Sequence, residues 1–342
     1  MLRTIKIDWN HLADFQTLET PFPRPERIHP GLDEINPETF PAYLDEIGLV
    51  GMGGSGFPAS TKIKANRGSH TLVINGIECE PGITIDKAVL LNDFLWVAAG
   101  ANACAQAIGA TRIILAVENN PELIQQLEKR YGEFQITGFS GRYPSGAEKL
   151  ILKKLTGKFP PPGTRPFEFG FLIQNAVSLR AVGRAIIDGI PVVERPLTLA
   201  MPSVGFYKNL IAPVGITIQE LFEIYNLPYD AAMHLISDSG LMMGREVSQF
   251  STIEKTTLSI LVLQRDEAFR EERPCTRCGA CNIACPLGLH PFTLTEKVRK
   301  GKTASATFKA QMTECFLCGV CAAVCPSGIP LVESLKKGKQ CL

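Results

Sequence analysis

The chain closes with two copies of one cysteine string, CTRCGACNIACP at residues 275–286 and CFLCGVCAAVCP at residues 315–326. In each copy, two residues separate the first three cysteines, and a fourth cysteine follows after three more residues and precedes a proline. This pattern is typical of paired [4Fe–4S] clusters in which the fourth cysteine of each string ligates the other cluster. It therefore indicates an electron carrier. The predicted ligand sets are Cys275, Cys278, Cys281 and Cys325 for one cluster, and Cys315, Cys318, Cys321 and Cys285 for the other.

Structural zinc and disulfides are the alternatives for closely spaced cysteines. Three such cysteines followed by Cys-Pro, repeated, fit neither alternative well. Gly279 and Gly319 lie inside the ligand loops, where close backbone approach and amide hydrogen bonds to sulfur are needed. Exchange of the fourth ligand would join two short helical segments into a unit that metal stabilises in place of a large core. The other cysteines receive no ligand role: Cys79, Cys104 and Cys341.

Composition indicates a globular protein. The 342 residues are 45% hydrophobic and 20% charged, which is enough for two or three domains with their own cores. A formal net charge of +1 argues against a general nucleic-acid binder. The residues after Glu296 carry eight Lys or Arg against Glu314 and Glu333, which indicates either a solvated helix surface or a docking face for an acidic redox partner.

The N-terminal residues 1–10 lack the charged-then-apolar pattern of a signal peptide, and no run of 18 residues is free of polar groups. Unprotected clusters also suit a reducing compartment. We therefore expect no membrane-spanning segment and a cytoplasmic protein, either free or held at the inner face of the cell membrane by a partner complex.

The order of strand and helix signals divides the chain into four parts. The predicted helices cover residues 38–47, 88–108, 121–131, 145–155, 176–187, 218–225 and 291–300, and two predicted strands cover residues 71–75 and 112–117. Alternation of this kind predicts an α/β domain with a largely parallel sheet, whereas the later short apolar runs predict a small mixed α+β sheet. The predicted parts are an extended proline-rich arm at 1–47, the α/β domain at 48–188, the α+β domain at 189–265 and a helical ferredoxin-like cluster domain at 266–342.

A glycine loop, GMGGSGFP at residues 51–58, precedes the first predicted strand. Its glycines would let backbone amides approach a phosphate at a helix start, with Lys62 in reach of the same anion. The spacing is not the dinucleotide fingerprint and no clear strand precedes it, so a plain turn and an exposed helix lysine remain the alternatives.

Two further strings carry polar groups. The string NGIECEPG at residues 75–82 follows the end of a predicted strand, where ligands bind in open parallel sheets. Asn75, Glu78 and Glu80 could therefore form hydrogen bonds to a flavin edge, a ribose or a nicotinamide. They could equally be turn residues and helix caps. YPSGAEK at residues 143–149 offers another helix start, with Ser145 as N-cap and Glu148 at the third position, a capping box unless a ligand is bound.

In order and texture these strings resemble the C subunit of Rnf-type electron-transport complexes, from about residue 48 to residue 330. The resemblance includes residues 174–175, the string SGLMMG at 239–244 and both cysteine strings. The α/β part is also similar to the NADH-binding flavin subunit of respiratory complex I, which has comparable G-x-G-G-x-G-F-P and N-x-x-E-x-E-P-G strings.

The resemblance implies FMN at the glycine loop with NADH stacked above it, and a small β-grasp (SLBB-like) scaffold at residues 189–265. The residues that it assigns to the flavin phosphate or ring are those of the loop from Gly51, namely Gly53, Gly54 and Gly56, together with Lys62. Asn75 and Glu78 would meet the isoalloxazine edge and Asn175 the ribityl-phosphate side. Gly146 is also assigned to cofactor binding. Phe57, Glu80 and Glu148 would line the NADH face.

Departures from the relatives accompany the resemblance. Ile77 stands where the complex I relative has an acid, and Gln174 stands where it has a paired Asn. The chain before Gly48 is short and lacks the longer N-terminal domain and histidine-rich opening that the Rnf protein usually shows.

We therefore predict an NADH-dependent oxidoreductase subunit with no catalytic side chain, in which FMN accepts a hydride and two [4Fe–4S] clusters pass single electrons to or from a partner such as a flavoprotein, ferredoxin or membrane redox complex. One alternative is a flavin-free adaptor that relays electrons from a separate flavoprotein. Another is a dedicated electron-input subunit of a specific reductase.

Overall fold

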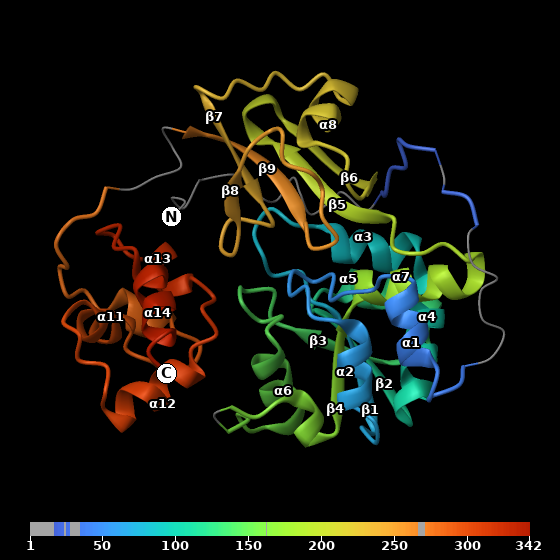
Figure 1. The fold of residues 1–342 in the computed structure, drawn as a ribbon, viewed down its shortest axis with the longest axis horizontal. Coiled ribbons are helices and arrows are strands. Elements are labelled where there is room, and N and C mark those ends of the chain that lie inside the picture. The colour runs from blue at the N-terminus through green and yellow to red at the C-terminus, as the bar shows by residue number, and fades with distance from the viewer. Residues whose placement is uncertain (1–16, 24, 28–34, 162, 266–270) are drawn as a thin grey trace.

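The computed structural model describes residues 17–23, 25–27, 35–161, 163–265 and 271–342. Most of the secondary structure falls into three units: an N-terminal unit from α1 to α7, a middle unit from β5 to β9 and a C-terminal unit from α10 to α14. In Figure 1 the middle unit lies above the N-terminal unit, and the C-terminal unit lies to one side of both. The first sixteen residues of the predicted arm and the predicted start of the cluster domain at 266–270 lie outside the described residues.

The N-terminal unit is built on a four-stranded sheet in which every strand pair is parallel, and this confirms the predicted sheet. One of its two inner strands, β1, is buried at every residue except the half-buried Asn75 and has three consecutive apolar side chains, as expected of a strand covered on both faces. At the carboxyl ends, Asn75 of β1 lies in register with Asn175 of β4. The strand order is β3 (Gln135–Phe139), β2 (Arg112–Glu118), β1 (Thr71–Gly76) and β4 (Phe171–Asn175).

Helices cover both faces of this sheet. The face with the larger apolar core packs against α1 (Phe40–Glu46), α2 (Ala59–Ala65), α3 (Ile85–Asn92), α4 (Phe94–Ile108), α5 (Pro121–Tyr131) and α7 (Ala176–Asp188). The opposite face packs against α6 (Glu148–Thr156) and the 3-10 turn η2 (Pro166–Phe169).

The predicted single helix at residues 88–108 is wrong, because the segment forms two helices, α3 and α4, that meet at 94°. The break falls at Asp93, whose backbone leaves helical geometry and whose carboxylate pairs with the buried guanidinium of Arg180 on α7. A tertiary ion pair therefore overrides a continuous helical pattern. No single helix in the described part of the chain is long and apolar enough to cross a membrane, although α3 and α4 together meet that length and composition.

The middle unit is built on a mixed sheet, as predicted, and this sheet has five strands. Strands β5 and β9 run parallel, and the other pairs are antiparallel. Glu19, from the proline-rich N-terminal segment, forms an isolated bridge with Leu210 of β6. The elements are β5 (Glu194–Met201), the 3-10 turn η3 (Pro202–Val204), β6 (Phe206–Pro213), α8 (Ile218–Ile224), β7 (His234–Asp238), β8 (Arg245–Val247) and β9 (Ser259–Gln264), in the sheet order β6-β5-β9-β7-β8.

Within the described residues, the C-terminal unit has five short helices around a small core that includes several of the string cysteines. The repeat seen in the sequence is also a repeat of backbone conformation: Arg277 and Leu317 have φ of 57° and 59°, and Gly279 and Gly319 have φ of 77° and 85°. The helices are α10 (Ala280–Ala284), α11 (Pro291–Arg299), α12 (Ala306–Glu314), α13 (Val320–Ala323) and α14 (Leu331–Lys339).

Candidate functional site

The glycine loop lies at the carboxyl ends of β1 and β4. The Gly51 amide donates to the Phe57 carbonyl at 2.8 Å, which closes the loop. Gly53 packs against the first residue before α7, since a Cβ at this position would lie 3.0 Å from the Cβ of Asn175. A residue with a side chain would therefore push the loop away from the strand end.

Two cavities border this loop: a main cavity of about 580 Å³ and a side cavity of about 260 Å³. Of the predicted residues, both cavities have Gly53, Asn75, Gly146 and Asn175 in their walls. Gly56 lines neither cavity, and its amide instead donates to the Gly51 carbonyl at 3.0 Å. The other predicted residues of the main cavity are Gly54, Glu78 and Glu80, and those of the side cavity are Gly51, Phe57, Lys62 and Glu148.

A cation faces the side cavity. The Lys62 ammonium donates to the Glu148 carboxylate at 2.8 Å and to the Ile173 carbonyl at 2.5 Å. The predicted capping box at the start of α6 is wrong, because Ala147 is the N-cap and the Ser145 hydroxyl donates to the Ser140 carbonyl. Glu148 thus pairs with Lys62 and does not cap the start of α6.

Two carboxyl groups lie at the floor of the main cavity. Glu78 accepts the amides of Asp86 and Lys87 at 3.2 and 2.9 Å, and Asn175 donates to Asp86 at 2.8 Å. Burial, with the neighbouring Asp86 carboxylate, raises the pKa of Glu78 well above its ordinary value. Burial likewise raises the pKa of Asp86 to about 6. Both shifts favour the protonated form of these carboxyl groups relative to the same groups in water.

Cys79 belongs to the wall of the main cavity, although its place in the sequence gave it no role. Its sulfur accepts the Gly146 amide at 3.3 Å, and the Asn75 side chain donates to the Gly146 carbonyl at 3.0 Å. Burial raises the pKa of the Cys79 thiol to about 11. The neutral Cys79 thiol and the Asn75 side-chain amide together hold the 143–147 turn against the end of β1.

Glu80 joins the N-terminal unit to the middle unit. Its carboxylate accepts the Met242 amide at 2.5 Å, and the Leu241 and Met243 amides also stabilise the charge. Burial still raises the pKa of Glu80 to about 7. At Gly240, where φ is +100°, a Cβ would collide with a Glu80 carboxylate oxygen, so the turn closes tightly over this side chain.

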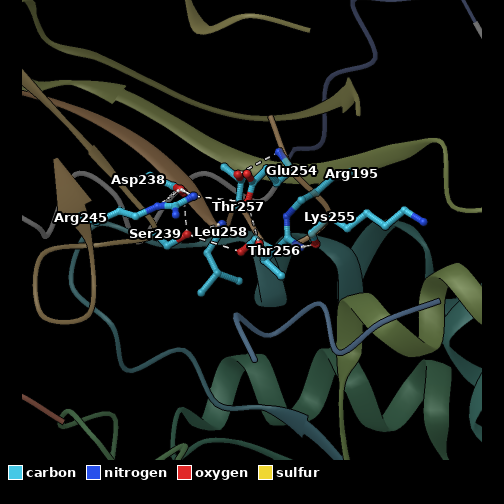
Figure 2. A network of polar contacts seen from close by, with 9 residues as sticks. All are labelled: Arg195, Asp238, Ser239, Arg245, Glu254, Lys255, Thr256, Thr257 and Leu258. Carbon is cyan, nitrogen blue, oxygen red and sulfur yellow. Dashed lines mark hydrogen bonds and ion pairs between the residues drawn. The ribbon is translucent and has the colours of Figure 1, made fainter. Parts of the chain in front are cut away.

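Residues of the middle unit form a polar rim on the main cavity. Figure 2 shows the network of polar contacts to which they belong. Arg245 pairs with Asp238 at 3.1 Å and with Glu254 at 3.3 Å. The Ser239 hydroxyl donates to Asp238 at 2.7 Å and accepts the Leu258 amide at 3.0 Å. These residues received no role at the site from the sequence, although Ser239 belongs to the SGLMMG string. They come to the loop only through the tertiary packing of β7, β8 and the turn before β9.

Each of two further cavities is lined by four cysteines, three from one string and one from the other. This is the grouping that the predicted exchange of the fourth ligand requires; ligation itself stays a prediction. The outer set lines a cavity of about 320 Å³ and comprises Cys275, Cys278, Cys281 and Cys325. The inner set comprises Cys285, Cys315, Cys318 and Cys321.

Backbone amides point at the sulfurs in the same way in both strings. The donors are the amides two positions further along: Arg277 to Cys275, Ala280 to Cys278, Leu317 to Cys315 and Val320 to Cys318. Amide hydrogen bonds of this kind stabilise negatively charged cluster sulfur. Four thiols with convergent amides are therefore a donor set that fits a [4Fe–4S] cluster.

The inner set adjoins the main cavity, since Phe316 and Cys318 line both. The Tyr143 hydroxyl, from the other wall of the main cavity, donates to the Cys318 carbonyl at 2.7 Å. The Lys149 ammonium at the start of α6 pairs with the Glu314 carboxylate at 2.9 Å. Tyr143 belongs to the YPSGAEK string, but nothing in the sequence signals its contact with Cys318.

Comparison with known proteins agrees with this arrangement. Residues 44–184 match the family described as the Nuo51 FMN-binding domain, and residues 274–329 match the 4Fe-4S dicluster domain. The C subunit of the ion-translocating oxidoreductase complex of Buchnera aphidicola is 32% identical over 329 residues, which cover 92% of this chain and 68% of the relative. The chain belongs to the family of these C subunits. The resemblance drawn from the sequence is thus confirmed.

Other members of the family differ in length. The C subunit of the proton-translocating ferredoxin:NAD(+) oxidoreductase complex of Clostridium ljungdahlii is 30% identical over 77% of this chain and 59% of the relative. The chain spans about a third of the length of several longer bacterial members. In fold, the chain is similar to a crystal structure of NAD+-reducing [NiFe]-hydrogenase, with a TM-score of 0.61 and 19% identity over 90% of this chain and 63% of the other.

Proposed function

We propose that the chain passes electrons between NADH and a partner redox protein by way of bound FMN and two [4Fe–4S] clusters. The observation that carries this proposal is the wall shared by the main cavity and the inner cysteine set, formed by Phe316 and Cys318. A flavin exchanges hydride pairs for single electrons, whereas a cluster accepts one electron at a time. The chain's own contribution is binding, orientation and electrostatics, with no side chain as a catalytic base.

The residues around the loop divide into those that hold the flavin and those that meet the nucleotide. The loop amides and Lys62 would bind the flavin phosphate, because an ammonium and convergent amides stabilise an anion. Asn75, Glu78 and Asn175 would bond the ring edge and the ribityl side. Phe57, which is 41% exposed and lines the side cavity, would pack against NADH beside Glu148, with Glu80 nearby.

The two cysteine sets would have different roles. The inner set adjoins the flavin-binding cavity and would be the entry point for electrons. The outer set contains Cys278, which is exposed, and would face the partner. The direction of flow follows the potentials of the donor and the acceptor.

The middle unit would be an SLBB-like β-grasp scaffold, and we assign the domains to residues 48–188, 189–265 and 266–342. The partners would be other electron-transfer subunits, a flavoprotein or a ferredoxin, in keeping with the name of the Clostridium ljungdahlii relative. A cytoplasmic location, with attachment to the membrane only through such partners, completes the proposal.

Bound-cofactor analysis of anaerobically purified protein tests the proposal. We expect about one FMN and about eight iron and eight sulfide atoms per chain, and bleaching of the cluster absorbance on addition of NADH. A flavin-free chain whose clusters do not respond to NADH would contradict the proposal and favour the flavin-free adaptor. The feature that favours the adaptor is Ile77, a buried apolar residue in the wall of the main cavity. Co-purification with one reductase would instead identify a dedicated electron-input subunit.

A further inference from the structure

We infer that Tyr143 is a positioning residue that fixes the inner cysteine set against the main cavity, with the Lys149–Glu314 ion pair as a second anchor. This role deepens the proposed function and rests on it, because the two links join the flavin-binding part of the chain to the cluster-binding part.

The geometry of Tyr143 suits such a role. Its side chain lines the main cavity, and its hydroxyl donates to the Cys318 carbonyl at 2.7 Å. The turn that carries Tyr143 is itself fixed, since the next residues are held by the hydrogen bond between the Gly146 amide and the Cys79 sulfur.

The Lys149–Glu314 ion pair holds the 315–326 string just before its first cysteine. The Lys149 ammonium contacts the Glu314 carboxylate at 2.9 Å and the Glu314 carbonyl at 3.3 Å, and the two side chains are only 21% and 23% exposed. Glu314 directly precedes Cys315, so the two anchors bracket the first half of the inner string. Removal of one partner from a partly buried pair destabilises more than removal from a fully exposed pair, because the remaining charge is left without compensation.

The outer string is the matched comparison inside the chain. Its residue at the position of Glu314 is Pro274, whose carbonyl accepts the Ser327 hydroxyl within the C-terminal unit at 3.0 Å. Its residue at the position of Cys318 is Cys278, which is exposed. Among the described residues, the contacts of the inner string with the N-terminal unit thus have no counterpart at these two positions of the outer string.

A hydrogen bond to the Cys318 carbonyl also acts on the electrostatics of the inner set. Donation from Tyr143 offsets the negative end of the peptide dipole beside the cysteine, which favours added negative charge at the site. Loss of the hydroxyl should therefore lower the reduction potential of the inner cluster and leave that of the outer cluster unchanged.

The test uses the full chain with both clusters, purified without oxygen. Tyr143→Phe retains the ring and removes the hydroxyl. The matched control is Tyr131→Phe, which removes a Tyr–carbonyl hydrogen bond of 3.0 Å to Leu90 inside the N-terminal unit. The readouts are a redox titration followed by EPR, with dithionite as reductant, and hydrogen exchange of the amides of residues 315–321.

With Tyr143→Phe we expect one of the two cluster potentials to fall and the other to stay constant. Exchange at 315–321 should rise about tenfold, which corresponds to a fall of about 1.4 kcal/mol in the free energy of local opening. Tyr131→Phe should change neither readout. Lys149→Gln and Glu314→Gln should each raise exchange at 315–321, and the swapped pair Lys149→Glu with Glu314→Lys should restore protection.

Unchanged potentials together with unchanged exchange in Tyr143→Phe would overturn the inference, as would equal shifts of both clusters. The dithionite titration requires neither NADH nor flavin. A native protein that ignores NADH would therefore count against the proposed function, while the variants would still decide the role of Tyr143.

Discussion

The inner and outer cysteine sets have the same spacing and the same backbone conformation, but they lie in different surroundings. In the outer set, Cys278 is exposed and the Ala280 amide lowers its pKa. In the inner set, burial raises the pKa of Cys318 to about 11 and that of Cys321 to about 12. The local string thus decides which metal group is bound, whereas contacts with the rest of the chain decide what each site adjoins.

The largest expected effect separates the two sets by their exchanged ligands. Cys285→Ser should remove most of the inner cluster and Cys325→Ser most of the outer cluster, because each fourth ligand comes from the other string. Iron and sulfide would fall to about half in both variants, with loss of different EPR signals. The control is Cys341→Ser, at an exposed cysteine outside both sets, which should leave both clusters intact. Loss of the same signal in both variants would contradict the exchange.

Replacement at the glycine loop should affect the flavin and spare both clusters. The side chain of Gly53→Val would meet Asn175, where even a Cβ lies at 3.0 Å, and FMN binding should weaken about a hundredfold, or about 2.7 kcal/mol. Flavin release measured by fluorescence checks this result. Undiminished FMN affinity would show that the flavin does not bind at this loop.

Exposure predicts a difference in the lifetimes of the two clusters. On addition of air, the outer cluster signal should decay about tenfold faster than the inner one, because solvent reaches Cys278. Parallel EPR and iron-release time courses measure the two rates. Equal rates, or faster loss of the inner cluster, would remove the proposed distinction in access.

The smallest expected effect concerns Glu80, which binds the middle unit beside the inner set. Its pKa of about 7 in the folded chain lies above the ordinary value of 4.5, so its stabilising contribution is complete below pH 4.5 and is lost as pH rises through 7. The free energy of unfolding of cofactor-free protein, relative to Glu80→Gln, should fall by about 2 kcal/mol between pH 5 and pH 8. Chemical denaturation at each pH checks this, and a flat difference would contradict the shift.

Much of this structure follows from local sequence patterns. The parallel sheet, the mixed sheet and the repeat of the cysteine strings could all be predicted, because alternating apolar runs and fixed ligand spacing act over short distances. The break at Asp93 could not, since it depends on Arg180 far along the chain. The same holds for the contact between Tyr143 and Cys318, and for the Arg245 rim, because such contacts depend on how separate units pack.

The most direct test of the relation between the cavity and the two sets is freeze-quench EPR of the native protein mixed with NADH. We expect the cluster signal that is absent from Cys285→Ser, that of the inner set, to appear first. Earlier appearance of the signal that is absent from Cys325→Ser would contradict the assignment of the inner set as the entry point.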